Sequence, residues 1–409
     1  MSTEKTEPLE ATNKIDEQNK EDESKSENDT FDFSSTYTDN LPKILKKLNI
    51  SLAVTSYQTA RVFFIRTDGD TLETHFKQYP RPMGIYADEH RITLGTFSQV
   101  LEFKRSDELL ESIKQGSLDN EQKFSKKVLE KDKERLEKLK EERKAALDEI
   151  KKADALYLPR ASITTGMINI HDIAWGTDGL WVVNSTFSCL STLSPDYSFV
   201  ARWKPPFISE LVPEDRCHLN GMAMRDGKPR YVTTFNKFDE RDSWTKENPH
   251  DGTLIDIKTN TTLIEGMVMP HSPRYYNGFV YVCESGEGRV WKINPNTREK
   301  TELARLQGFT RGINFYGGLM FVGLSKTRAS DVKKPIPLSE LYDETFSGIW
   351  VLNPENGTEI AHLKFEGDLA QIYDIAVIPN ATQAELLSGN NSLIRHIFDY
   401  QESIRKTIQ

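Results

Sequence analysis

The sequence contains few cysteines, and they lack the spacing of a disulfide or zinc framework. The 409 residues include three cysteines, Cys189, Cys217 and Cys283, which are widely separated and form no CxxC pair. An odd and scattered set argues against a disulfide framework and against a structural zinc site. We therefore expect all three to be small buried hydrophobic residues.

Long apolar runs and a positive net charge are also missing. No segment approaches the roughly 18 consecutive apolar residues of a membrane span, and the first residues lack the basic start and apolar stretch of a secretory signal. The net charge of -9 provides no general attraction to nucleic acid or to acidic membranes. We therefore expect a cytoplasmic protein without nucleic-acid or membrane partners.

The N-terminal region lacks aromatic residues. None occurs in the first 30 residues, and the aliphatic ones are too few to offset the entropy of ordering. We predict a disordered acidic tail over residues 1–35, a folded domain over residues 36–380, and a C-terminal tail or short helix over residues 381–409.

Short apolar segments with tight turns dominate the chain from Ile50 onward. They are rich in β-branched and aromatic residues and are broken by Asp-Gly, Asn-Gly and Gly-Gly, which is typical of short strands. Several stretches share a polar opening, an apolar strand, a turn and a second apolar strand. They begin at Arg81, His171, His218, His271 and Thr310. Spacings such as the 48 residues from Asp172 to Asn220 fit one four-stranded propeller blade per unit.

The two ends of this repeat pattern complement each other. The first unit, which includes the segment from Thr59, lacks an innermost strand, and Tyr373–Pro379 resembles an innermost strand with no blade after it. If the second segment completes the first unit, the ring closes without exposed sheet edges. We therefore predict an all-β fold, a six-bladed β-propeller closed by a C-terminal strand.

A charged segment interrupts the repeats over residues 104–155. Its main part, Gln122–Ala153, has no Gly or Pro, and many acidic residues precede a basic one by three or four positions. These features favour a long, solvent-exposed helical insertion. The helix has a partial apolar stripe that Arg143 interrupts. The pattern therefore fits either a solvated strut or hairpin, or a coiled coil that forms a homodimer.

Polar residues recur where the predicted strands meet the central channel. In a propeller each innermost strand begins at one face of the channel and its hairpin partner ends at that face, so we expect these residues to converge. The predicted members at the inner strand starts are Arg81, His171, Asp172, His218, Asn220, His271, Arg274, Arg311 and Asp374. The predicted members at the ends of the second strands are Asn184, Asn236, Glu284 and Lys326.

Three of these residues are histidines in consecutive units. His171, His218 and His271 fit hydrogen-bond ties between blades, ligands of zinc or iron, or groups for ligand contact and acid–base catalysis. The residue types alone leave the three interpretations open.

Oxygen donors in the same ring suggest a different metal. Asp172, Asn220 and Asp374 carry the carboxylate and amide oxygens that suit calcium, so a divalent cation is a candidate cofactor.

Arginines in the ring suggest an anion instead. Arg81, Arg274 and Arg311 could hold a carboxylate, phosphate or sulfate, or could pair with acidic neighbours such as Asp172. The motifs GxSxG, GxxxxGK[ST] and HExxH are absent. We therefore favour a module that binds a small anionic molecule or a peptide. The alternative is a metal-dependent hydrolase or isomerase in which a histidine is the general base.

A series of motifs resembles one family. The segments SLAVTSYQ, RPMG, HDIAW, WKPPFISELVPEDRCHLNG, MPHSPR and YDIAVIP follow in that order. They resemble a family of bacterial proteins, frequent in cyanobacteria, known as conserved hypothetical propeller-like proteins of unknown function. The resemblance runs from about Leu52 to Pro379; it implies a propeller and carries over no activity.

A weaker likeness concerns calcium-dependent lactonases, which are also six-bladed and whose inner strands open with Asn-Gly or Asp-Gly. Those enzymes have a glutamate near the first inner strand, where this chain has Asp374. The difference leaves the hydrolase analogy in doubt, and the likeness remains an analogy of fold.

Overall fold

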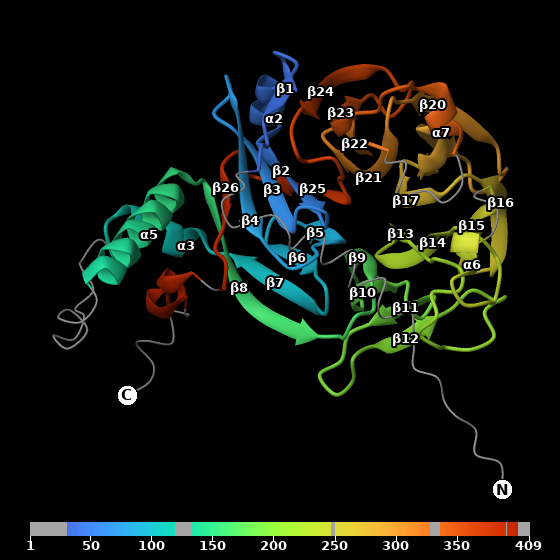
Figure 1. Cartoon of the computed structure of the whole chain (residues 1–409), viewed down its shortest axis with the longest axis horizontal. Coiled ribbons are helices and arrows are strands. Elements are labelled where there is room, and N and C mark those ends of the chain that lie inside the picture. Colours follow the sequence, from blue (N-terminus) through green and yellow to red (C-terminus); the bar gives the residue numbers. More distant parts are fainter. Residues whose placement is uncertain (1–30, 119–132, 247–249, 328–335, 390, 400–409) are drawn as a thin grey trace, which may run out of the picture.

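Six small sheets surround a common axis (Figure 1). The computed structural model describes residues 31–118, 133–246, 250–327, 336–389 and 391–399. The first strands of neighbouring sheets contact one another around the ring, so they line the axis. This arrangement confirms the predicted six-bladed β-propeller. Residues 1–30, most of the predicted disordered tail, lie outside the described residues.

Each blade is one sheet, and its strands follow one another from the axis outwards. Blade 1 contains β25 (Asp374–Pro379), β2 (Ile50–Ser56), β3 (Arg61–Thr67) and β4 (Leu72–Gln78). Blade 2 contains β5 (Ile85–Ala87), β6 (Arg91–Gly95), β7 (Gln99–Arg105), β8 (Ala155–Thr164) and β26 (Ala384–Leu386). Blade 3 contains β9 (Ile170–Gly176), β10 (Gly179–Asn184), β11 (Cys189–Thr192) and β12 (Val200–Trp203).

The second half of the ring follows the same plan. Blade 4 contains β13 (Gly221–Arg225), β14 (Lys228–Thr234), β15 (Gly252–Asp256) and β16 (Thr261–Met267). Blade 5 contains β17 (Pro270–Tyr276), β18 (Phe279–Glu284), β19 (Arg289–Ile293) and β20 (Lys300–Arg305). Blade 6 contains β21 (Phe309–Tyr316), β22 (Leu319–Ser325), β23 (Ser347–Leu352), β24 (Glu359–Phe365) and β1 (Ser35–Tyr37).

The hydrophobic core lies between neighbouring blades. Phe63 of blade 1 packs in the same buried cluster as Phe321 of blade 6, and Val232 of blade 4 packs with Val183 of blade 3. Burying such a side chain stabilises the fold by about 1.5–3 kcal/mol. Each blade contributes apolar side chains to the clusters that it shares with both of its neighbours.

The two ends of the chain are built into the ring. Strand β25 pairs antiparallel with β2, with Val377 opposite Leu52, as the sequence predicted. Strand β1 joins the outer edge of blade 6, where Tyr37 lies opposite Leu363. Residues 381–409, expected to form a tail or short helix, contribute β26, which pairs parallel with β8, and then the 3-10 helix η2 (Ser392–His396).

The charged insertion forms a helical layer outside blade 2. Helices α3 (Asp107–Lys114) and α5 (Lys133–Lys152) pack beside β8 and η2 around a buried cluster that includes Ile113 and Ile150. Residues 119–132 of the predicted insertion lie outside the described residues. The role of this helix as a strut or a dimerisation arm stays a prediction.

The other helical segments are short. They are α2 (Leu41–Leu48), α6 (Ser243–Lys246), α7 (Pro337–Leu341) and the 3-10 helix η1 (Ser285–Glu287). No helix in the described part of the chain combines the length and apolar character needed to cross a membrane.

Candidate functional site

The three predicted histidines lie together at one face of the propeller axis. The ring centroids of His171 and His218 are 4.6 Å apart, with the rings edge to face. Phe235 bridges the next gap, because its ring centroid lies 4.6 Å from that of His218 and 5.1 Å from that of His271. Strand starts in blades 3, 4 and 5 therefore converge as the sequence predicted.

Two arginines and a tyrosine complete this group. The guanidinium carbon of Arg311 lies 3.6 Å from the ring centroid of Tyr373, and the Tyr373 ring lies 5.6 Å from the ring of His171. Arg81 is close enough for its charge to act on both His171 and Tyr373. We call His171, His218, His271, Arg81, Arg311 and Tyr373 the axial cluster.

His171 is held by a serine that also contacts the next blade. Its Nδ1 lies 3.0 Å from the carbonyl oxygen of Asn169 and 2.7 Å from Oγ of Ser185. The Ser185 hydroxyl in turn donates a hydrogen bond to the carbonyl oxygen of Leu219, which precedes blade 4. The serine therefore links two blades and orients the imidazole.

The same arrangement recurs at His271 in blade 5. Its Nδ1 lies 3.1 Å from the carbonyl oxygen of Met269 and 2.8 Å from Oγ of Ser285. The Ser285 hydroxyl donates to the carbonyl oxygen of Thr310 in blade 6 at 2.5 Å. Two blades thus use one histidine–serine design, which agrees with the interpretation of these histidines as ties between blades.

The environment of these two rings favours the neutral imidazole. Burial lowers the pKa of His171 well below its usual range, and the nearby His218 and Arg311 lower it further. Burial also lowers the pKa of His271, with Arg311 as the next cause. Both histidines are therefore uncharged at pH 7.

His218 has a different partner. Its Nδ1 lies 2.8 Å from Oδ2 of Asp215, and its ring lies against Trp244 with centroids 4.0 Å apart. Both His218 and Asp215 adopt positive φ angles, 47° and 43°, so the loop before β13 is bent sharply to bring them together. A carboxylate on Nδ1 orients the ring and stabilises a proton that arrives at Nε2.

Arg274 bridges two carboxylates from other blades. Its Nη1 is 2.7 Å from Oδ2 of Asp172 in blade 3, and its Nη2 is 3.6 Å from Oδ1 of Asp374 in blade 1. Each carboxylate also accepts backbone N–H groups, including that of Met222 for Asp172 and that of Ile85 for Asp374. Burial raises the pKa of Asp374 despite the positive charge of Arg274.

This geometry bears on the proposed calcium ligands. Asp172 and Asp374 already have a cationic partner in the Arg274 guanidinium. A buried carboxylate pair needs one such partner to offset the loss of solvation. The ion-pair interpretation therefore applies to Arg274, while the metal role of Asp172 and Asp374 remains a prediction.

Two residues at the ends of the second strands serve their own blades. Glu284 accepts hydrogen bonds from the backbone N–H of Val268 at 2.8 Å and from the indole of Trp291 at 2.6 Å. Oδ1 of Asn184 accepts from the backbone N–H of Phe187 at 3.0 Å. These bonds hold backbone and side-chain groups beside the strand ends, and none of them joins the axial cluster.

The remaining predicted residues have similar local partners. Asn236 donates to Oγ of Ser243 at 3.0 Å, and Oδ1 of Asn220 accepts from the hydroxyl of Thr233 at 2.7 Å. Lys326 follows β22 and is partly exposed. None of these contacts joins the side chains to the axial cluster.

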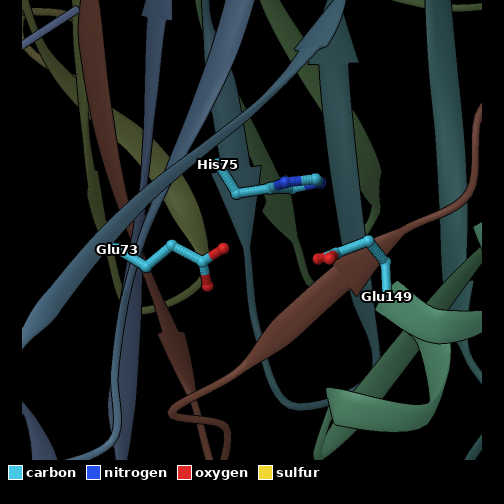
Figure 2. Close-up of side chains that lie close together, drawn as sticks. All are labelled: Glu73, His75 and Glu149. Carbon is cyan, nitrogen blue, oxygen red and sulfur yellow. The ribbon is translucent and has the colours of Figure 1, made fainter. Parts of the chain in front are cut away.

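A second polar group lies outside the ring, between blade 1 and helix α5. Ligand atoms of Glu73, His75 and Glu149 lie within 4.8 Å of one another, and Figure 2 shows the three side chains pointing toward a common space. Nη2 of Arg66 occupies this region, 2.7 Å from Oε2 of Glu73 and 3.0 Å from Oε2 of Glu149, and its Nη1 is 3.1 Å from Oε2 of Glu385. The group is therefore an ion-pair network that fastens α5 and β26 to blade 1.

Several residues of the axial site were not predicted from the sequence. They are Asp215, Tyr373, Ser185 and Ser285. One signal was present for the serines, since both histidine–serine pairs are separated by 14 positions. Asp215 and Tyr373 gave no such signal, because their partners depend on a bent loop and on ring closure.

Solved structures and one family model match this chain. The crystal structure of a nidogen/laminin complex contains a chain with a TM-score of 0.48 and 10% sequence identity, and the match covers 81% of this chain and 99% of that one. No curated protein matches the sequence. Residues 39–127 and 122–387 match the family described as a domain of unknown function, DUF4915. Because these segments include most of the chain, the protein belongs to the DUF4915 family.

Proposed function

We propose that this propeller binds a small anionic molecule at the axial cluster through Arg81 and Arg311. The observation that supports the proposal is that these two arginines have no acidic partner among the described residues. By contrast, Arg274 pairs with Asp172, and Arg230 pairs with Asp256 at 2.7 Å. Two partly exposed cations on one face thus remain available to an anion.

The surroundings of the two arginines favour an anion over a cation. His171 and His271 are neutral at pH 7, so neither ring carries a negative charge that would compete with an anion for the guanidinium groups. Tyr373 lies against Arg311, and this cation–π contact fixes the guanidinium without neutralising it. A carboxylate or phosphate oxygen can then accept paired hydrogen bonds from an arginine fork.

The test is a thermal-shift and calorimetric titration of the full chain with acetate, sulfate and inorganic phosphate. An anion at about 100 times its dissociation constant should stabilise the folded state by about 2.7 kcal/mol. Arg311→Gln and Arg81→Gln should each weaken this effect, whereas Arg298→Gln, at an exposed arginine in the turn after β19, should not. Equal responses from all three variants would show that the anions act through general screening.

An acid–base enzyme is the second candidate function, and one contact favours it. The Asp215–His218 pair orients the His218 ring and leaves Nε2 without a hydrogen bond among the described residues. Such a pair suits a general base. The metal-dependent form of this candidate, a hydrolase or isomerase that uses Asp172, Asn220 and Asp374, has less support because Arg274 already pairs with the two carboxylates.

A further inference from the structure

The protonation state of the histidine rings restricts which anion suits the axial cluster, if the anion-binding function above holds. Nδ1 of His171 and of His271 each lies near a backbone carbonyl oxygen, at 3.0 Å from Asn169 and 3.1 Å from Met269. A carbonyl oxygen can only accept, so Nδ1 must carry the proton in both rings. In a neutral imidazole the other nitrogen, Nε2, is then a hydrogen-bond acceptor.

The two serines strengthen this assignment. Ser185 uses its proton on the carbonyl oxygen of Leu219, and Ser285 uses its proton on that of Thr310. Each hydroxyl oxygen is therefore available only as an acceptor toward Nδ1–H of its histidine. The serines thus place the imidazole proton on Nδ1 both at His171 in blade 3 and at His271 in blade 5.

In its neutral form His218 supplies a third acceptor. Its Nδ1 faces the Asp215 carboxylate at 2.8 Å, which again places the proton on Nδ1. In the described part of the chain, no hydrogen bond involves Nε2 of any of the three rings. Three nitrogen lone pairs in one cluster therefore lack a donor.

These lone pairs select against a bare anion. An anionic oxygen placed beside an imidazole acceptor is repelled, so a ligand that binds the arginines must present donors to the histidines. Two donors in the protein are also unmatched, since the Tyr373 hydroxyl and Nε1 of Trp244 are buried without partners. The aromatic rings of Phe235 and Phe309 flank His271, with centroids 5.1 Å and 5.5 Å away, and offer contact to C–H groups.

We propose that the ligand is a hydroxylated acid, such as a sugar acid, whose carboxylate binds Arg81 and Arg311 and whose hydroxyl groups donate to Nε2 of the histidines. Hydroxyl groups both donate and accept, so the same molecule can also satisfy Tyr373. The C–H groups of the ligand can pack on the rings of Phe235 and Phe309. A simple carboxylate or sulfate lacks these donors.

The test is calorimetric titration of the full chain with gluconate, hexanoate and glucose at about pH 8, where imidazole is neutral. Gluconate and hexanoate have the same carbon number and charge and differ in their hydroxyl groups. Gluconate should bind at least about tenfold more tightly than hexanoate, since even one unmatched acceptor weakens binding by about that factor. Glucose, which has hydroxyl groups but no charge, should bind most weakly.

Variants separate the two proposals. His271→Phe removes one acceptor next to two phenylalanine rings and creates no new charge, so the preference for gluconate over hexanoate should shrink by about tenfold. His90→Phe, at an exposed position, is the matched control. Equal binding of gluconate and hexanoate, both lost in Arg311→Gln, would overturn the hydroxylated-acid inference and leave anion binding intact. If neither acid binds, anion binding at this cluster is wrong as well.

A second measurement covers variants that fail to fold. Nitrogen chemical shifts of the imidazole rings in the unmodified protein report which nitrogen carries the proton. His171 and His271 should show protonated Nδ1 and unprotonated Nε2. The opposite tautomer would overturn the inference whatever the variants do.

Discussion

Arg274 of blade 5 reaches across the propeller axis to Asp172 of blade 3, with Nη1 2.7 Å from Oδ2 and Nη2 3.2 Å from Oδ1. This two-bond contact joins blades that are not neighbours in the sheet order. Arg274 also donates to the backbone carbonyls of Met222 in blade 4 and Ile313 in blade 6 and lies 3.6 Å from Asp374 of blade 1, so this one side chain contacts four other blades. We expect it to stabilise the closed ring.

Replacing Arg274 with methionine should therefore be strongly destabilising. The change keeps much of the side-chain volume but leaves two buried carboxylates without their cation, which costs about 3–5 kcal/mol. Urea unfolding measures this cost as a lower transition midpoint at an unchanged m-value, the slope of the unfolding free energy against urea concentration. Lys237→Met is the control, because the exposed Lys237–Glu265 pair should contribute less than about 1 kcal/mol. A similar loss in both variants would contradict the structural role of Arg274.

Removal of either serine hydroxyl should weaken the contact between blades. Ser185→Ala leaves the Leu219 carbonyl without its donor, and Ser285→Ala does the same for Thr310. Each change should lower the free energy of unfolding by about 1–3 kcal/mol, the cost of an unsatisfied buried polar group. Ser198→Ala, at an exposed position, should change it by less than about 0.5 kcal/mol. If neither Ser185→Ala nor Ser285→Ala changes the free energy of unfolding, the two serines do not tie neighbouring blades together.

Acid should destabilise the protein through His171 and His271. Their folded-state pKa values are lowered, mainly by burial, whereas both rings titrate near pH 6.5 in the unfolded chain. The unfolded state therefore binds more protons, and this stability is present above about pH 6.5 and is lost as the pH falls. Below about pH 6.5, each of the two histidines lowers the free energy of unfolding by about 1.4 kcal/mol for each unit of pH.

Ring titration by nuclear magnetic resonance checks the pH prediction directly. In the folded protein His171 and His271 should stay neutral at pH values where the same rings in the urea-unfolded chain become protonated, near pH 6.5. Titration of both rings near pH 6.5 in the folded protein would show that His171 and His271 are not buried as described.

The cysteines should not react with thiol reagents in the folded protein. All three are buried and free, and burial raises the pKa of Cys189 to about 11 and that of Cys283 to about 12. Since the thiolate is the reactive form, labelling by a chromogenic disulfide should begin only on unfolding in urea. Rapid labelling of even one cysteine under native conditions would contradict the predicted role as a buried apolar residue.

Much of the fold was readable from the sequence because its signals are local. Short apolar runs with Gly-containing turns mark strands, and a recurring polar opening marks each blade start. The unmatched segment Tyr373–Pro379 was enough to predict closure with β2, which the pairing of Val377 with Leu52 confirms. The strand β26 was not predicted, because its three residues pair with β8 far away in the sequence and carry no pattern of their own.

The ring of polar strand starts was likewise determined by the sequence, since strand direction alone places such residues at one face. Only the tertiary structure decided how they differ. Arg81, Arg274 and Arg311 looked equivalent, yet Arg274 is paired across the axis whereas Arg81 and Arg311 have no acidic partner in the described chain. The physical reason is that an ion pair depends on distances between blades, and those distances are set by packing of the whole ring rather than by neighbouring residues.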